Sequence, residues 1–175
     1  MAKIIRNQTI VDDDWTRLDD TAPVPATGKF ILSLARWQAE KAALKPRGQL
    51  GALIDGKLDV VGLQDDLHYL SLIVIPFVFI QPKPEGGRTF DGRGYSQARL
   101  LRERLGFKGE IRATGDVFRD AMYYMHRCGI NEFEMNPGQD LKDALNAFKD
   151  FSTAYQAAAD GQPSVFRRRN ANVAG

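Results

Sequence analysis

The stretch SLIVIPFVFI, residues 71–80, decides the class of fold. Apart from one serine and one proline it is a continuous apolar run of strand length, rich in β-branched and aromatic side chains. A strand that alternates polar and apolar residues has one face in water, whereas a continuous apolar run is typical of a strand covered on both faces. We therefore predict that residues 71–80 form a central strand of a parallel sheet.

Strand and helix patterns alternate along the chain on both sides of this run. We expect strands at residues 3–11, 29–34, 49–55, 108–114 and 131–135, and helices at residues 35–45, 61–70, 95–106, 117–129 and 141–155. Because parallel strands need right-handed helical crossovers, this order predicts a single α/β domain around a mostly parallel sheet. A flavodoxin-like open sheet is the preferred arrangement, and a partial β/α barrel is the alternative. We place the domain at residues 1–157 and expect a flexible tail at residues 158–175.

Individual residues give more local expectations. Asp116 and Asp140 stand directly before helical patterns and are predicted to cap them, and Ser96 is placed to cap the helix after the glycines. Phe151 and Tyr155 continue the apolar stripe of the last helix, so we expect both side chains to face the core.

Composition and charge exclude several classes of protein. The chain has 175 residues, a net charge of +2 and a single cysteine, Cys128. The charge is too small to indicate a nucleic acid partner or an anionic membrane, and the longest apolar run is too short to span one. A lone cysteine forms no internal disulfide and fits a reducing compartment, so we expect a cytoplasmic protein without a signal peptide. Cys128 lies in an apolar stripe, where a buried and inert thiol is expected.

The same counts limit the redox chemistry that the chain can house. One cysteine and two histidines, His68 and His126, cannot build a four-thiolate iron–sulfur centre, and no zinc-ligand spacing occurs. No metal site is expected and no cofactor is evident. A redox group would have to be a non-covalently bound flavin or nicotinamide, or belong to a partner.

The richest candidate site follows the central strand. The loop DGRGYS, residues 91–96, has two glycines around an arginine and opens a helix, and ligands of α/β sheets bind beyond the carboxyl ends of strands. Residues 88–127 hold nine lysines and arginines and five acidic residues, a local charge of +4. These features favour an anion or an acidic protein partner. The alternative is a structural turn with solvated ion pairs. The candidate residues are Asp91, Gly92, Arg93, Gly94, Tyr95, Ser96, Arg99, Arg112, Thr114, Gly115, Asp116, Arg119 and Asp120.

Residues 91–135, DGRGYSQARLLRERLGFKGEIRATGDVFRDAMYYMHRCGINEFEM, closely resemble a bacterial family known as domain of unknown function 934. The motifs DGRGYSQARLLRERLG, GDVFRD and RCG followed by FE carry this resemblance. In the family the link from the strand to the glycine loop is short, whereas here VFIQPKPEGGRTF is longer and rich in proline. Members of the family are encoded beside assimilatory sulfite reductase and are labelled as oxidoreductases of sulfite reduction.

The resemblance implies a role in sulfate assimilation. We expect an accessory protein that binds sulfite reductase, another enzyme of the pathway or an oxyanion intermediate through the glycine loop and the turn at Asp116. In this interpretation Arg93 and Arg119 supply positive charge, and nearby aspartates orient them. An oxidoreductase with a bound flavin or nicotinamide is the second hypothesis. A structural subunit that assembles into a homo-oligomer is the third.

Overall fold

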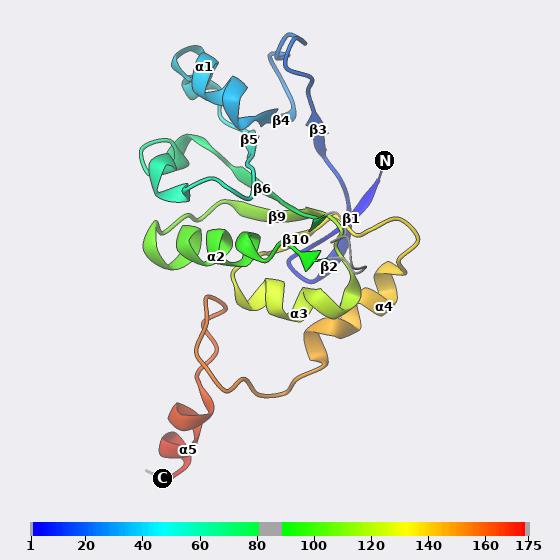
Figure 1. Ribbon diagram of the computed structural model, residues 1–175, viewed down its shortest axis with the longest axis vertical. Helices are drawn as coiled ribbons and strands as arrows, with labels where there is room; N and C mark the ends of the chain where they lie inside the picture. Colours follow the sequence, from blue (N-terminus) through cyan, green and yellow to red (C-terminus); the bar gives the residue numbers. More distant parts are fainter. Residues whose placement is uncertain (1, 81–88, 174–175) are drawn as a thin grey trace.

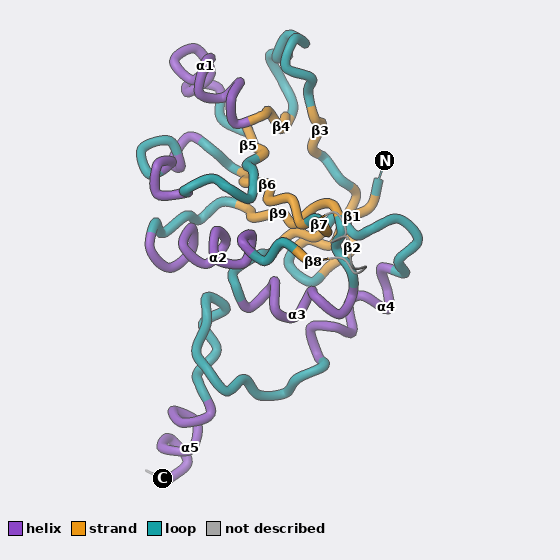
Figure 2. Tube along the Cα trace, viewed as in Figure 1, coloured by secondary structure: helices purple, strands orange, loops and turns teal. Residues whose placement is uncertain are grey.

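A computed structural model describes residues 2–80 and 89–173. Its main sheet has eight strands in the order β2-β1-β10-β9-β6-β5-β4-β3 (Figure 1). The strands are β1 (Lys3–Arg6), β2 (Thr9–Asp12), β3 (Trp15–Arg17), β4 (Lys29–Ser33), β5 (Leu50–Leu53), β6 (Leu72–Phe77), β9 (Glu110–Gly115) and β10 (Glu132–Phe133). A separate two-stranded ribbon contains β7 (Phe79–Ile80) and β8 (Thr89–Phe90) (Figure 2).

Six strands of the main sheet are parallel and lie side by side in chain order: β3, β4, β5, β6, β9 and β10. This confirms the predicted α/β fold with a mostly parallel sheet, and the unbroken order is that of the partial β/α barrel. The predicted central strand is β6, which pairs with β5 on one side and β9 on the other. Its residues are buried on both faces, as the apolar run indicates.

The helices cover one face of the sheet. They are α1 (Leu34–Leu44), α2 (Arg93–Arg99), its π-helical continuation η4 (Leu100–Arg104), α3 (Arg119–Arg127) and α4 (Leu141–Asn146), and short 3-10 turns η2 (Val60–Leu63) and η3 (Leu67–Tyr69) link β5 to β6. Two further 3-10 turns, η1 (Lys45–Arg47) and η5 (Ala147–Lys149), follow α1 and α4. The helical segments that connect successive strands, and α4, contribute apolar side chains to one continuous core. This core includes Trp37, Leu63, Leu101, Met125 and Ala144.

The opposite face of the sheet is called here the concave face. It carries a small apolar cluster of Trp15, Ile31, Leu72 and Val74, and a row of charged side chains on β9, β10 and β1. No helix of the described residues packs on the apolar cluster of this face.

The two edge strands, β2 and β3, follow one another in the chain with only Asp13 and Asp14 between them. Three peptide steps span at most about 11 Å. Eight strands side by side in a flat sheet would separate its edges by about 34 Å. The sheet therefore has to curl until its edges approach each other, and the concave face becomes the inside of a half-barrel.

Several local expectations need correction. The strand predicted at residues 3–11 is a hairpin, because Asn7 and Gln8 both adopt positive φ and turn the chain between β1 and β2. Asp116 does not cap α3, which starts later, at Arg119. Ser96 lies inside α2, and the Asp91 carboxylate accepts the Arg93 backbone N–H at the start of that helix. Asp140 caps α4 as predicted.

After α4 the chain passes beside α3, where Ala154 is buried and the Ala159 backbone N–H donates to the Arg127 carbonyl. The helix predicted at residues 141–155 ends early, so Phe151 and Tyr155 are exposed instead of packed in the core. A further helix, α5 (Val165–Val173), lies in the segment predicted as a tail and stands away from the sheet (Figure 1). Within residues 2–80 and 89–173, no helix combines the length and apolarity needed to cross a membrane.

Candidate functional site

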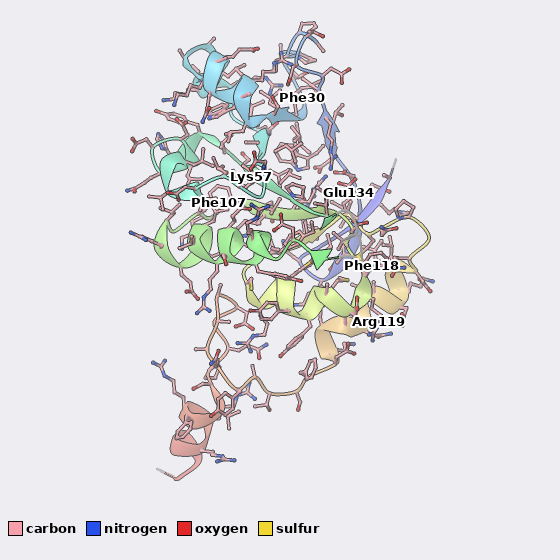
Figure 3. All side chains as sticks on the ribbon, in the orientation of Figure 1. Phe30, Lys57, Phe107, Phe118, Arg119 and Glu134 are labelled. Carbon is pink, nitrogen blue, oxygen red and sulfur yellow. The ribbon has the colours of Figure 1, made fainter. Side chains whose placement is uncertain are left out.

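The helices α2 and α3 begin near the carboxyl ends of β6 and β9, and a cleft of about 520 Å³ lies at the start of α3. This cleft brings together four of the predicted site residues, Tyr95, Asp116, Arg119 and Asp120. Phe118, Ala121 and Gln139 complete its lining. Figure 3 shows the labelled Phe118 and Arg119 at this end of α3.

Tyr95 is the aromatic centre of this region. Its ring lies 5.1 Å from that of Phe77 and 4.9 Å from that of Tyr124. Burial is the main cause that raises the pKa of Tyr95 to about 12, and neighbouring groups, including Asp120, add to it. A phenol with such a pKa keeps its proton at neutral pH, so Tyr95 can donate a hydrogen bond but is a poor base.

Two carboxylates hold Arg119: Asp143 of α4 and Asp150, which directly follows η5. Arg119 Nη2 lies 2.9 Å from Asp150 Oδ1, its Nη1 lies 3.0 Å from Asp150 Oδ2, and its Nε lies 3.3 Å from Asp143 Oδ2. The hydrogen bond to Asp150 is the largest cause that raises the pKa of Arg119. The guanidinium therefore stays charged, but its charge is balanced within the chain.

Arg93 is paired in the same way. Its Nε and Nη2 donate to the Asp91 carboxylate at 2.9 and 2.6 Å, which is the ion pair expected from the sequence. The pair lies against the turn after β5, where a Cβ on Gly56 would come within 3.0 Å of Asp91 Oδ2. Gly92 is the residue before α2, and Gly94 has to be glycine because a Cβ would lie 2.7 Å from the Phe77 ring.

Ser96 and Arg99 of α2 do not line the cleft at α3. Arg99 donates to Glu103 one turn later at 2.9 Å, and Ser96 lines a shallow groove beside this pair. Arg99 also borders a second cleft of about 590 Å³ between α3 and residues 151–158. Tyr124, Phe151 and Tyr155 around this second cleft are 59%, 61% and 73% exposed. The glycine loop and the start of α3 thus share one side of the molecule.

Arg112 and Thr114 lie on the other side of the sheet, apart from the glycine loop. Arg112 is 1% exposed and donates to Glu132 on β10 at 2.7 Å and to both oxygens of Asp13 at 2.9 and 2.7 Å. Thr114 Oγ1 accepts from Arg17 and donates to Glu134, each at 2.8 Å. Gly115, at φ +90°, then turns the chain back toward α3.

These contacts belong to a network of charged residues that sequence reasoning missed. Arg6 joins Glu132 to Asp14, and Lys29 donates to Asp14 as well. The missed members are Arg6, Asp13, Asp14, Arg17, Lys29, Glu132 and Glu134. A signal was present, because residues 110–114 and 132–134 alternate polar and apolar side chains and so predict a polar row on one sheet face.

The described residues contain no group of three or more histidine, cysteine, aspartate or glutamate side chains placed to hold a metal ion. Cys128 is buried, as predicted, and burial is the main cause that raises the pKa of its thiol.

Comparison with known proteins gives a family but no activity. No curated protein matches the chain. A family described as "Bacterial protein of unknown function (DUF934)" matches residues 51–166, which is well over half of the 175 residues. The match includes β5 except its first residue, β6, β9, β10 and all helices from α2 to α4. The chain therefore belongs to the DUF934 family.

Proposed function

We propose that this chain is an accessory protein of assimilatory sulfite reduction that acts by binding a protein of that pathway, sulfite reductase in the first place. The observation that carries the proposal is the exposed aromatic surface beside the glycine loop. We define this surface, the α3 face, by Arg99, Tyr124, Phe151 and Tyr155 around the 590 Å³ cleft.

The composition of the α3 face is that of a protein interface. Tyrosine and arginine are the residues most enriched among those that dominate binding energies, and large aromatic side chains are costly to leave in water. Tyr123 and Phe151 pack with ring centroids 4.8 Å apart, and Tyr95 packs on Tyr124 at 4.9 Å. Because Tyr124 and Phe151 each pack on a neighbouring ring, these two side chains are restrained before a partner binds, which lowers the entropy lost on binding.

Charge on this side favours a protein over a free oxyanion. Arg93, Arg99 and Arg119 are each balanced by a carboxylate of the chain itself, and the cleft at α3 also carries Asp116 and Asp120. A small anion would have to displace a carboxylate of the chain from each of these arginines. A protein surface with charges of both signs can pair with these arginines and carboxylates. Such charge pairs contribute to specificity more than to affinity.

The assignment to sulfite reduction rests on the resemblance of residues 91–135 to the DUF934 family and its genomic neighbours. The direct experiment is a binding titration of the purified chain against purified sulfite reductase from the same host, followed by calorimetry. We expect a complex with the wild-type chain and an affinity at least about tenfold weaker after the double change Tyr124→Ala and Tyr155→Ala.

Val78→Ala provides a matched control, because Val78 is an exposed apolar residue at the end of β6 and outside the α3 face. This variant should bind as the wild type does. The proposal is wrong if the wild-type chain and the reductase do not associate at micromolar concentrations, or if a deletion strain grows normally with sulfate as sole sulfur source. A rise in melting temperature with a flavin or nicotinamide would instead support the oxidoreductase hypothesis.

A further inference from the structure

Three residues from distant parts of the sheet meet on the concave face: Arg17, Thr114 and Glu134. We call this place, at the carboxyl ends of the strands, the mouth of the concave face. Arg17, at the end of β3, places its Nη2 2.8 Å from Thr114 Oγ1 on β9 and 2.7 Å from Glu134 Oε2 just after β10. In the sheet, β3 and β9 are separated by β4, β5 and β6. The contact exists only because the sheet curls, so it belongs to the half-barrel and not to any single crossover.

The position of this cluster is that of a ligand site. Arg17, Thr114 and Glu134 lie at the carboxyl ends of three parallel strands. In β/α barrels the binding and catalytic residues gather at this end, while the interior below is packed with side chains. Here Trp15, Ile31, Leu72 and Val74 form an apolar cluster on the same face, and Arg17 lies two residues beyond Trp15 on β3. Figure 3 shows the labelled Glu134 near the end of β9, apart from Arg119.

Hydrogen-bond donors remain available at this mouth. The Arg17 side chain is 47% exposed, and its Nε and Nη1 donate to no acceptor within residues 2–80 and 89–173. Thr114, in contrast, is only 6% exposed and holds its hydroxyl toward the arginine. A guanidinium presents parallel N–H groups that match two oxygens of a carboxylate, sulfate or phosphate.

A buried layer of charged side chains lies beneath the mouth. Two residues below Thr114 and Glu134 on the same strands, Arg112 and Glu132 are 1% and 0% exposed and bond to each other at 2.7 Å. Asp13 accepts from Arg112 and ties this layer to the short link before β3. These contacts hold the strand that carries Thr114, so the Thr114 hydroxyl needs little reorganisation when a ligand binds.

The Glu134 carboxylate stands where an external anion would be held. One of its oxygens, Oε2, accepts from both Arg17 Nη2 and Thr114 Oγ1. Since both charged side chains of this pair are close to half exposed, the pair is weak and can be exchanged for a ligand. We propose that the mouth of the concave face binds a small anion with at least two acceptor oxygens. Arg17 and Thr114 donate to it, and the Glu134 carboxylate gives way.

The test uses the full chain and inorganic phosphate, sulfate and acetate as separate probes, with chloride at equal ionic strength as the reference. Melting temperature and chemical shifts of backbone amides report binding. Glu134→Gln removes the competing charge, and we expect its affinity for at least one of the three anions to exceed that of the wild type by about fivefold. Arg17→Gln should abolish the effect of the anions on melting temperature and chemical shifts. Arg17→Lys keeps the charge but loses the parallel N–H groups of the guanidinium, so it should retain only a small part of this effect.

Arg119→Gln is the control, because Arg119 is another arginine paired with carboxylates, is 34% exposed and lies on the helix-covered side. Its anion response should equal that of the wild type. The proposal is overturned if Arg17→Gln and wild type respond alike, if Glu134→Gln gains nothing, or if neither wild type nor Glu134→Gln binds any of the three anions at tens of millimolar. Loss of binding in Arg119→Gln would also overturn it. Reversible urea unfolding of each variant separates loss of binding from loss of fold.

Discussion

Arg112 and Glu132 lie side by side on neighbouring parallel strands, with Arg112 Nε 2.7 Å from Glu132 Oε2, and both side chains are almost completely buried. Removing two charges from water is costly, and the attraction between them repays this only when their remaining hydrogen bonds are satisfied. Asp13 meets this need for Arg112, and Arg6 meets it for Glu132. The pair therefore joins the centre of the sheet to β1 and to the link between its two edges.

We expect Arg112→Met to destabilise the fold by about 3–5 kcal/mol, because Glu132 and Asp13 would be left without their partner in the interior. Equilibrium urea unfolding measures this change. Lys3→Ala is the control, since the Lys3–Asp12 pair is exposed and should contribute less than about 1 kcal/mol. A loss below 1 kcal/mol for Arg112→Met would show that the network adds little to stability.

Asp14 makes stability depend on pH in the acid range. Partial burial by itself raises the pKa of Asp14, but hydrogen bonds and charges from Lys29 and Arg6 outweigh it and hold the pKa at about 2. A carboxylate with a lowered pKa stabilises the folded state above its unfolded pKa of about 3.9, and this contribution disappears as the pH falls toward 2. We expect Asp14→Asn to lose less stability than the wild type between pH 5 and pH 2 in urea unfolding. Parallel curves for the two proteins would contradict this.

Gly115 is required at the turn after β9. Its φ is +90°, and a Cβ there would lie 2.6 Å from the Phe77 carbonyl oxygen. We expect Gly115→Ala to cost at least about 2 kcal/mol, because backbone strain and a clash with main-chain atoms combine.

Two other glycines separate these causes. Gly106 has a φ of +65° with nothing within 4 Å of its Cβ position, so Gly106→Ala should show strain alone, about 1 kcal/mol. Gly62 has neither feature, and Gly62→Ala should change the free energy of unfolding little. The expected order of melting temperatures is Gly62→Ala highest and Gly115→Ala lowest, and any other order is inconsistent with the geometry.

Cys128 should report opening of the core at α3. The residue is 6% exposed, and burial is the main cause of its raised pKa, so little reactive thiolate is present at neutral pH. We expect a disulfide reagent to label the native chain slowly and the urea-unfolded chain rapidly, as followed by absorbance of the released thiol. A cysteine placed at exposed Ser152 in a Cys128→Ser background should react rapidly in both states. Equal native rates at the two positions would contradict burial of Cys128.

The local expectations succeeded where neighbouring residues alone decide the conformation. The apolar run in β6, the α1 pattern and the cap at Asp140 are each signalled by residues close together in sequence. They failed where a distant contact outweighed local preference. Asp116 looks like a cap, yet its backbone N–H donates to the Phe77 carbonyl across the sheet and α3 begins later.

The candidate site divides in the same way. The glycine loop and the start of α3 were recognisable because their residues are close in sequence, and the Asp91–Arg93 pair spans only two residues. The cluster of Arg17, Thr114 and Glu134 was not recognisable, because Arg17 and Thr114 are 97 residues apart and no local pattern relates them.

The amino-acid sequence by itself determined the alternation of strands and helices, the buried central strand and membership of the DUF934 family. These depend on side-chain periodicity and on short motifs, which are readable along a single chain. Only the tertiary structure decided that Arg119 is paired with Asp143 and Asp150, and that a second polar cluster lies on the opposite face of the sheet. The polar cluster follows from the two-residue link that forces the sheet to curl, because curvature brings together side chains whose separation along the chain carries no sign of their contact.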